Sequence, residues 1–388
     1  MRFLHTADWQ IGKPFARISD PDKAARVRSE RIEAILRIGD LARTEKASFV
    51  LVAGDLFDSF TAEKSTVSAA CSAIGRIEIP VLAIPGNHDH GGPGCLWNQD
   101  FFKQEQKSLA PNFRILLDRE PVELDDALLL PCPLLRQHET EDPTGWIRSL
   151  DLPTHSSEKP RIVLAHGSVH GFDSSADSED EIGAGAPNLI AIDRLPSSEI
   201  DYIALGDWHG TKEVTEYAWY SGTPEIDRFP RGAANDPGNV LLVELERGGK
   251  PEVEVRETGK LGWHVHSFEF ASDEDLDRFK EEIGAKLGNR AGEDLFQLEL
   301  DGSLGFGAAR QVDDYLETLQ ARLLRLKVRN RVRIAPSEEE VAVLASRPGD
   351  PLLSRVATSL IEATSGTGED AEIARIALRE LHRAVGND

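Results

Sequence analysis

The stretch SFVLVAGDLFD, residues Ser48–Asp58, decides the fold of this chain. Its first half, Ser48–Ala53, is a short apolar run bounded by turn residues, which predicts a buried β-strand. Its second half, Gly54–Asp58, places two carboxylates directly after that strand. Polar side chains at the ends of buried strands converge on one sheet edge, where α/β proteins build their active sites. The stretch therefore predicts an α/β fold with a functional site at the edge of a sheet.

Four further motifs in the first 210 residues carry the same kinds of polar side chain. They are Asp8-Trp9-Gln10, Gly86-Asn87-His88-Asp89, Ala165-His166-Gly167 and Gly206-Asp207-Trp208-His209. Each motif alone is ordinary turn chemistry, but five in order along the chain indicate a metal site. Oxygen and imidazole donors without cysteine suit hard or borderline divalent ions. Two such ions side by side can clamp a phosphate and activate a water.

Length and composition limit the classes of protein that need consideration. A chain of 388 residues predicts two or three domains, and 40% hydrophobic with 29% charged residues is typical of a soluble globular protein. Met1 leads directly into a strand, without a secretory leader, and no apolar run approaches the ~20 residues of a membrane span. The three cysteines show no C-x-x-C spacing. We therefore expect a cytoplasmic protein without a membrane partner.

The charge balance bears on the substrate. Lys and Arg total 44 and Asp and Glu total 67, which gives a net charge of -23. Such acidity argues against a passive nucleic-acid coat, because phosphate binding is driven by cations. It leaves a nuclease open, since bound metal ions and a local basic strip can supply positive charge.

Alternating apolar strands and helical segments predict the domain organisation. Residues 1–263 form the first domain, with helices at Arg28–Ala42 and Ala62–Ile74. Residues 264–336 form a small α/β domain with strands around Val265–Phe270 and Lys327–Ile334. Residues 337–388 form a linker and C-terminal helices. Two further segments are predicted to be irregular, a loop at Phe172–Pro187 and the linker residues Pro336–Glu340.

Taken together, several motifs resemble a calcineurin-like metallophosphoesterase, and more closely its SbcD-type DNA repair exonuclease branch. They are His5-Thr6-Ala7-Asp8-Trp9, Gly54-Asp55-Leu56-Phe57-Asp58, Gly86-Asn87-His88-Asp89 and Tyr220-Ser221-Gly222-Thr223-Pro224-Glu225. The resemblance implies an α/β fold, in which a metallophosphoesterase β-sandwich flanked by helices carries a small α/β cap domain and C-terminal helices. Residues 1–263 would then be the nuclease domain and 264–336 the capping domain.

The resemblance also implies a role for each matching residue. It implies two divalent ions, with manganese expected and magnesium as the alternative, bridged by Asp55. The first ion would be held by Asp8, Gln10 and His209, and the second by Asn87, His166 and Asp207.

Two residues of these motifs are expected to act in catalysis. His88 would lie over the phosphate and stabilise the transition state or protonate the leaving oxygen. Asp58 would either orient His88 or another ligand through its carboxylate, or cap the next helix.

Two positions depart from the family pattern. Gln10 and Asp207 stand where the family usually has histidine. Replacing imidazoles by oxygen donors makes the pair of sites harder and favours manganese or magnesium over zinc. Gln10 either binds metal through its carbonyl oxygen or leaves that position to a water.

Three functions remain open on the sequence. The first is a two-metal phosphodiesterase cleaving DNA, an exonuclease in DNA repair or recombination. The second is a phosphatase or cyclic-nucleotide phosphodiesterase, which the net charge of -23 favours. The third is a metal-binding scaffold with decayed catalysis, which Gln10 suggests. The alternating cations of Arg325–Arg333 would either contact a DNA backbone or form the solvated face of an edge strand.

The C-terminal helices suggest protein partners. The helix Glu369–Val385 carries an apolar stripe on an otherwise charged surface, made of Ile373, Ile376, Ala377 and Leu381. This stripe would dock an SbcC-like ATPase or pack against a matching stripe on Leu352–Ile361, and the two alternatives are not exclusive. We also hypothesise that the catalytic domains pair as a homodimer.

Overall fold

The computed structural model describes residues 1–152, 158–169, 187–230, 236–288, 290, 292–334, 351–364, 366 and 368–385. These residues divide into two compact units, Met1–Leu261 and Gly262–Asp388, which are described separately below. The predicted linker Pro336–Glu340 lies outside the described residues, as does the predicted loop Phe172–Pro187 except for its last residue.

The first unit contains two six-stranded sheets. The first sheet has the order β12-β11-β1-β2-β3-β4, in which β1 to β4 are parallel and β11 runs antiparallel to β1. Its strands are β1 (Arg2–Thr6), β2 (Val50–Ala53), β3 (Val81–Ile84), β4 (Phe113–Ile115), β11 (Asn239–Glu244) and β12 (Glu252–Glu257). The strand expected at Ser48–Ala53 is thus present as β2, and each of its residues is buried.

The second sheet has the order β5-β6-β7-β8-β10-β9, with β6, β7, β8 and β10 parallel. Its strands are β5 (Val122–Glu123), β6 (Leu128–Cys132), β7 (Arg161–His166), β8 (Tyr202–Gly206), β9 (Lys212–Thr215) and β10 (Ala218–Tyr220). The connections between the strands include short 3-10 turns at Leu96–Asn98, Gly145–Ser149 and Ile192–Arg194.

The two sheets pack face to face. Phe3 and Leu51 from the first sheet and Ile162 and Ala204 from the second are fully buried in one shared cluster. His5 crosses this core, where its Nε2 donates to the carbonyl oxygen of Leu205 at 3.1 Å and its Nδ1 accepts from a tyrosine hydroxyl of the second sheet at 3.0 Å. Burial lowers the pKa of His5 to about 3. The expected β-sandwich flanked by helices is confirmed.

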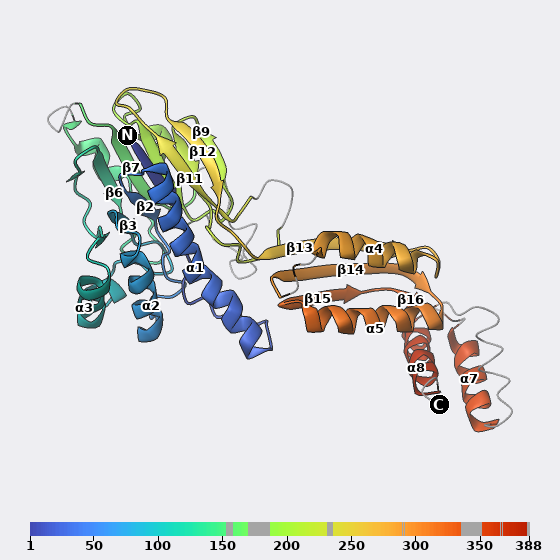
Figure 1. Ribbon diagram of the computed structural model, residues 1–388. Helices are drawn as coiled ribbons and strands as arrows, with labels where there is room; N and C mark the ends of the chain where they lie inside the picture. Colours follow the sequence, from blue (N-terminus) through green and yellow to red (C-terminus); the bar gives the residue numbers. More distant parts are fainter. Residues whose placement is uncertain are drawn as a thin grey trace. The chain divides into compact units, whose positions relative to one another are not determined.

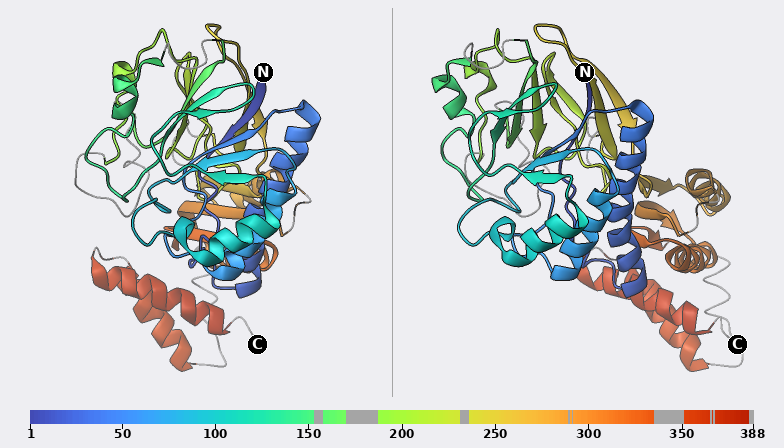
Figure 2. Two further views of the ribbon diagram at one scale, coloured as in Figure 1. Left: turned by 90° about the vertical axis from the view of Figure 1, so that its left-hand side faces the viewer. Right: turned by 60° about the vertical axis from the view of Figure 1, so that its left-hand side comes forward.

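Three helices cover the outer face of the first sheet. They are α1 (Pro21–Glu45), α2 (Lys64–Gly75) and α3 (Asp100–Leu109), and Figure 2 shows them together on one flank of this unit. α1 starts earlier than predicted because Asp20 caps it, accepting from the backbone N–H groups of Asp22 and Lys23. Its residue Ile35 packs with Val52 of the sheet, and this contact anchors the strand ends that carry the candidate site.

The second unit contains a parallel sheet of β13 (Gly262–Phe270), β14 (Asp294–Leu304), β15 (Arg325–Asn330) and the short β16 (Arg333–Ile334) (Figure 1). Helices α4 (Asp275–Leu287) and α5 (Phe306–Arg322) pack against it, and Phe279 of α4 and Val312 of α5 join Leu298 in the core. The single strand expected at Lys327–Ile334 is therefore two strands, since Arg331 and Val332 interrupt the ladder.

The C-terminal helices α7 (Pro351–Thr364) and α8 (Glu369–Val385) pack on each other and, through Ala357 and Leu378, on Phe306. Of the two alternatives for the stripe on α8, packing against α7 holds only in part. Ile373 and Ile376 are 57% and 52% exposed, whereas Ala371, Ala374 and Leu378 are buried. Small alanines let two helices approach closely, which leaves the larger aliphatic side chains outside. Among the described residues, no helix combines the length and apolar character that a membrane span requires.

Candidate metal centre

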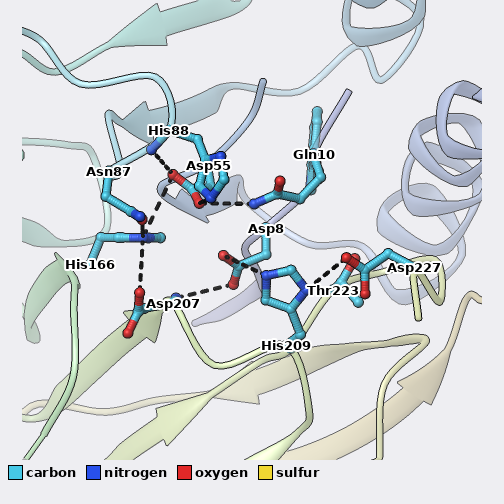
Figure 3. Close-up of polar contacts among 12 residues, drawn as sticks. Asp8, Gln10, Asp55, Asn87, His88, His166, Asp207, His209, Thr223 and Asp227 are labelled. Atoms are coloured by element: carbon cyan, nitrogen blue, oxygen red, sulfur yellow. Dashed lines mark hydrogen bonds and ion pairs between the residues drawn. The ribbon is translucent and has the colours of Figure 1, made fainter. Parts of the chain in front are cut away.

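The five motifs meet at one end of the sandwich. Parallel strands carry their carboxyl ends to the same edge, so the loops after β1, β2 and β3 lie beside the ends of β7 and β8. Figure 3 shows the candidate ligands facing one another from both sheets. They are Asp8, Gln10, Asp55, Asn87, His166, Asp207 and His209.

Two carboxylates and one imidazole form the centre of this cluster. One donor atom each from Asp8, Asp55 and His166 lies within 4.8 Å of the others, and all three side chains are buried. Asp55 Oδ1 is 3.7 Å from His166 Nε2, and Asp55 Oδ2 accepts a hydrogen bond from Gln10 Nε2 at 2.9 Å. Asp55 thus occupies the middle position that a bridging carboxylate requires.

One group of candidate ligands surrounds His166. Its Nδ1 lies 2.8 Å from the carbonyl oxygen of Ala53 and donates to it, so Nε2 faces the cluster. There Nε2 is 2.8 Å from Asn87 Oδ1 and 3.8 Å from Asp207 Oδ1. The Ser168 hydroxyl donates to Asp207 Oδ2 at 2.9 Å. The structure therefore brings the three residues expected at the second metal together.

The other group lies around Asp8. His209 Nε2 is 3.9 Å from Asp8 Oδ1, and His209 Nδ1 is 3.1 Å from Asp227 Oδ2 and 2.7 Å from a nitrogen of Arg228. The tautomer with its proton on Nδ1 donates to Asp227 and leaves Nε2 free to coordinate. A hydrogen bond from the Arg228 nitrogen, which can only donate, would require the other tautomer. Gln10 turns its amide nitrogen toward Asp55. The three residues expected at the first metal thus also share one side of the cluster.

Two buried oxygen atoms of the cluster without hydrogen-bond partners indicate whether these residues can hold metal ions. Asp8 Oδ1 and Gln10 Oε1 are buried and have no hydrogen-bond partner. A buried polar atom left unpaired is costly, and a carboxylate more so. Burial, together with the neighbouring carboxylates of Asp55 and Asp207, raises the pKa of Asp8 well above its usual value despite the attraction of His166. Cations among these oxygens would remove both penalties, so the residues fit divalent ions.

His88 stands at the open side of the cluster, where its side chain is 44% exposed. Its backbone N–H donates to Asp55 Oδ1 at 2.9 Å, and its Nε2 is 3.9 Å from Asp55 Oδ2. Its Nδ1 lies 3.0 Å from the backbone carbonyl oxygen of Asp58. Burial tends to lower the pKa of His88, but Asp55 and Asp58 raise it above the ordinary value.

Among the contacts of the described residues, the carboxylate of Asp58 neither touches His88 nor caps a helix, although its charge acts on His88. The carbonyl group of Asp58, and not its carboxylate, contacts His88. The carboxylate lies 3.7 Å from Lys13 Nζ. The helix that follows, α2, starts after Glu63 and is therefore not capped by Asp58. The sequence does not indicate whether the main chain or the side chain of Asp58 makes the contact with His88.

The ligand loops adopt unusual backbone conformations. Asp8, Gln10, Asp55 and Asp207 have φ angles of 53°, 48°, 53° and 105°. Each such non-glycine residue costs on the order of 1–3 kcal/mol, and such residues cluster at functional sites. Gly54 has a φ angle of 90°, and in addition a Cβ atom there would lie 2.3 Å from His166 Nδ1. The strain and the close approach both serve to bring donor atoms together.

Three charged residues that support the cluster were not identified in the sequence. Asp89 accepts from the backbone N–H groups of Phe57 and Gly86, and burial next to Asp55 raises its pKa to about 7. Asp227 holds His209, and Arg31 contacts the Asp8 loop. Asp89 and Asp227 lie in or just after quoted motifs and could have been suspected. Arg31 lies within α1 and gives no signal.

Two solved structures and one protein family are similar to this chain. A crystal structure of TT1561 of Thermus thermophilus is similar with 13% identity and a TM-score of 0.40, over 66% of this chain and 98% of that chain. A second crystal structure is similar with 10% identity and a TM-score of 0.42, over the same shares of the two chains. The model of the calcineurin-like phosphoesterase family matches residues 1–229, which is more than half of the chain and includes every candidate ligand, and the chain belongs to that family.

Proposed function

We propose that this metallophosphoesterase is a two-metal phosphodiesterase that cleaves DNA, an SbcD-type exonuclease acting in DNA repair or recombination. Membership of the family implies metal-dependent hydrolysis of phosphoesters. The cluster around Asp8, Asp55 and His166 is a candidate site for the ions. Manganese is the proposed ion and magnesium the alternative, because the donors are oxygen and nitrogen atoms without sulfur.

Asp55 would bridge the two ions, which supply a clamp on the phosphate and an activated water when bound. Each ion would be held by the ligand group described above, the first around Asp8 and the second around His166. His88 is proposed to act on the substrate. Its Nδ1 donates to a backbone carbonyl, so its Nε2 faces the cluster, and its raised pKa favours a proton there. That proton can be donated to the leaving oxygen.

The observation that supports DNA over a small substrate is a row of cations on β15 and at Arg331, which directly follows it. Lys327 and Arg329 are exposed on the sheet face opposite to the core residue Leu298. Arg329 is 3.6 Å from Glu299 and Arg331 is 3.3 Å from Asp301, with the arginine side chains 66% and 58% exposed. Exposed ion pairs are worth at most about 1 kcal/mol, so backbone phosphates can replace these carboxylates. A small ester carries one phosphate group and cannot contact several cations along a strand.

The test compares two substrates in manganese. We expect the wild-type protein to degrade linear DNA faster than p-nitrophenyl phosphate esters. The double variant Lys327→Glu with Arg329→Glu should weaken DNA binding by about 10-fold or more and reduce the slope of log affinity against log salt by about 2, since each lost phosphate contact removes about 0.9. Its turnover of the small esters should be unchanged. Arg278→Glu with Lys286→Glu, which reverses two exposed cations on α4, is the matched control.

Each other outcome points to one of the rival functions. Equal loss on both substrates would remove the role of β15 in binding DNA. Cleavage of small esters without cleavage of DNA would favour a phosphatase or cyclic-nucleotide phosphodiesterase. Two bound ions without turnover of any ester would favour a scaffold with decayed catalysis.

We also propose that an SbcC-like ATPase docks on α7 and α8, and that the catalytic domains pair as a homodimer. Leu352, Val356, Ile373 and Ile376 are between 41% and 72% exposed, whereas Ala357 and Leu378 are buried within the unit. Large apolar side chains that stay exposed are typical of a helical docking surface.

Surface substitutions test the docking better than truncation, because removing α7 and α8 would uncover Phe306. Ile373→Asp with Ile376→Asp should abolish co-purification with the ATPase and leave cleavage of short DNA intact. Thr358→Asp with Ser359→Asp adds the same charge at exposed positions of α7 and should retain both co-purification with the ATPase and cleavage of short DNA. Retained co-purification in the first variant would place the docking surface elsewhere, and a monomeric mass in solution would contradict the homodimer.

A further inference from the structure

Arg31 of α1 is a fully buried cation next to the metal cluster that belongs to neither group of candidate ligands. Its side chain is 2% exposed. Its guanidinium donates from Nε to the carbonyl oxygen of Trp9 at 2.7 Å, and from one terminal nitrogen to the carbonyl oxygen of Asp8 at 3.2 Å and to Thr223 Oγ1 at 2.9 Å. The other terminal nitrogen donates to the carbonyl oxygen of Glu225 at 3.1 Å.

These contacts reach two segments, and both serve the same half of the cluster. The loop Asp8–Gln10 supplies two candidate ligands of the first metal. The segment Thr223–Asp227 ends in the carboxylate of Asp227, which lies 3.1 Å from His209 Nδ1. Figure 3 shows Asp8, His209, Thr223 and Asp227 on one side of the cluster. None of the hydrogen bonds of Arg31 given above goes to Asn87, His166 or Asp207.

The Asp8–Gln10 loop depends on Arg31 for its carbonyl groups. The backbone N–H groups of Asp8 and Gln10 already donate to the carbonyl oxygens of Gly54 and Asp55, at 3.1 and 3.0 Å. The carbonyl oxygens of Asp8 and Trp9 accept from Arg31. Asp8 and Gln10 are also held in the left-handed region, at φ angles of 53° and 48°. A strained loop stays in place only when its surroundings fix it on several sides.

We infer that Arg31 is a positioning residue for the first metal site. It fixes Asp8 and Gln10 directly, and fixes His209 through the segment that carries Asp227. This inference rests on the ligand groups proposed above. Lysine cannot replace Arg31, because an ammonium lacks the planar fork that reaches two carbonyl groups and a hydroxyl at once.

Arg37 of the same helix provides a matched control. It pairs with Glu30 and Glu225 at 2.5 and 2.7 Å and donates to the carbonyl oxygen of Thr258. It therefore shares the partner Glu225 with Arg31, but its hydrogen bonds do not reach the Asp8–Gln10 loop. A change that only loosened the packing of α1 would appear in both variants.

The experiment is a calorimetric titration with manganese of the 388-residue chain and of three variants, Arg31→Lys, Arg37→Lys and Thr223→Val. We expect Arg31→Lys to weaken one of two sites by about 10–100-fold, the usual effect of removing a group that orients a ligand, and to leave the other unchanged. High manganese should then restore turnover without a change in KM. Arg37→Lys should bind both ions as the wild type does. Thr223→Val, which removes one acceptor of Arg31, should weaken the same site by a smaller factor.

Each remaining outcome is decisive. If Arg31→Lys weakens both sites equally, or weakens neither, the inference about Arg31 is overturned. The proposed function still stands in that case, provided that the wild type binds two ions. Fewer than two ions bound by the wild type would overturn both. If Arg31→Lys does not fold, Thr223→Val decides, and unchanged affinity at both of its sites would overturn the inference.

Discussion

The two groups of candidate ligands share Asp55 but are held in place by different kinds of contact. Around His166 the support comes from the strand framework, since Nδ1 donates to the carbonyl oxygen of Ala53 at the end of β2. Around Asp8 it comes from buried charges, because Asp227 holds His209 and Arg31 holds the loop. A site built on strand ends forms with the sheet itself. A site held by buried charges from other segments can be weakened by one substitution outside the set of ligands.

The largest expected effect removes what the two groups share. Asp55→Asn should abolish hydrolysis, because it weakens both metal sites at once. The measurement is turnover together with metal content. Asp40→Asn, at an exposed carboxylate of α1 that pairs with Arg43, should behave as the wild type. A wild-type rate in Asp55→Asn would show that this residue does not bridge.

The next effect leaves both groups intact. His88→Ala should retain two ions and lose about 10²–10⁴-fold in turnover, the usual range for a general acid. The reason is that Nε2 of His88 points at the cluster from its exposed side, while neither of its nitrogens is near Asp8, His166 or Asp207 in the contacts given above. Metal analysis and single-turnover rates check this, and loss of a metal ion would make His88 a ligand instead.

The pH dependence of metal binding should separate the two groups. In the metal-free protein, burial tends to lower the pKa of His166, but the carboxylates of Asp55, Asp8 and Asp207 raise it to about 9. Burial and Arg228 lower the pKa of His209 to about 4. At pH 7 a metal must therefore displace a proton from His166 and none from His209.

The affinity of the site around His166 should consequently rise about tenfold per pH unit from pH 7 until it levels off near pH 9, while the other site gains nothing from this source. Calorimetry in buffers of different ionisation enthalpy measures the released proton directly. The predicted difference concerns the histidines, because the raised pKa of Asp8 lets the other site release a proton from that carboxyl group. An affinity of the site around His166 that does not rise between pH 7 and pH 9 would contradict the prediction.

The smallest expected effect concerns Gln10. Its amide nitrogen, a group that cannot coordinate, faces Asp55, and its oxygen is unpaired. Gln10→His would restore the common family ligand and should tighten only the site around Asp8, by several-fold. Manganese titration checks this. Unchanged affinity at both sites would mean that residue 10 does not touch metal in this protein.

Much of the fold and the clustering of candidate ligands could be predicted, because both follow from local patterns. Short apolar runs followed by Asp, Asn or His give parallel strands and their ends. The support of the cluster follows from long-range packing, which no such pattern records. Arg31 is one of many cations on a helix until its contacts with Trp9 and Thr223 are seen.

The C-terminal helix shows a second limit. The sequence predicts an apolar packing stripe that includes the large side chains Ile373 and Ile376, yet both are exposed. Close packing of helices selects small residues at the contact, and Ala371 and Ala374 occupy it instead. On α8, the large residues Ile373 and Ile376 therefore mark the exposed surface, whereas Leu378 and the two alanines mark the buried one.

Anomalous diffraction from crystals soaked in manganese tests the central claim most directly. The account predicts two anomalous peaks that share Asp55, one beside Asp8 and His209 and the other beside Asn87, His166 and Asp207. A single peak, or peaks without contact to Asp55, would contradict it.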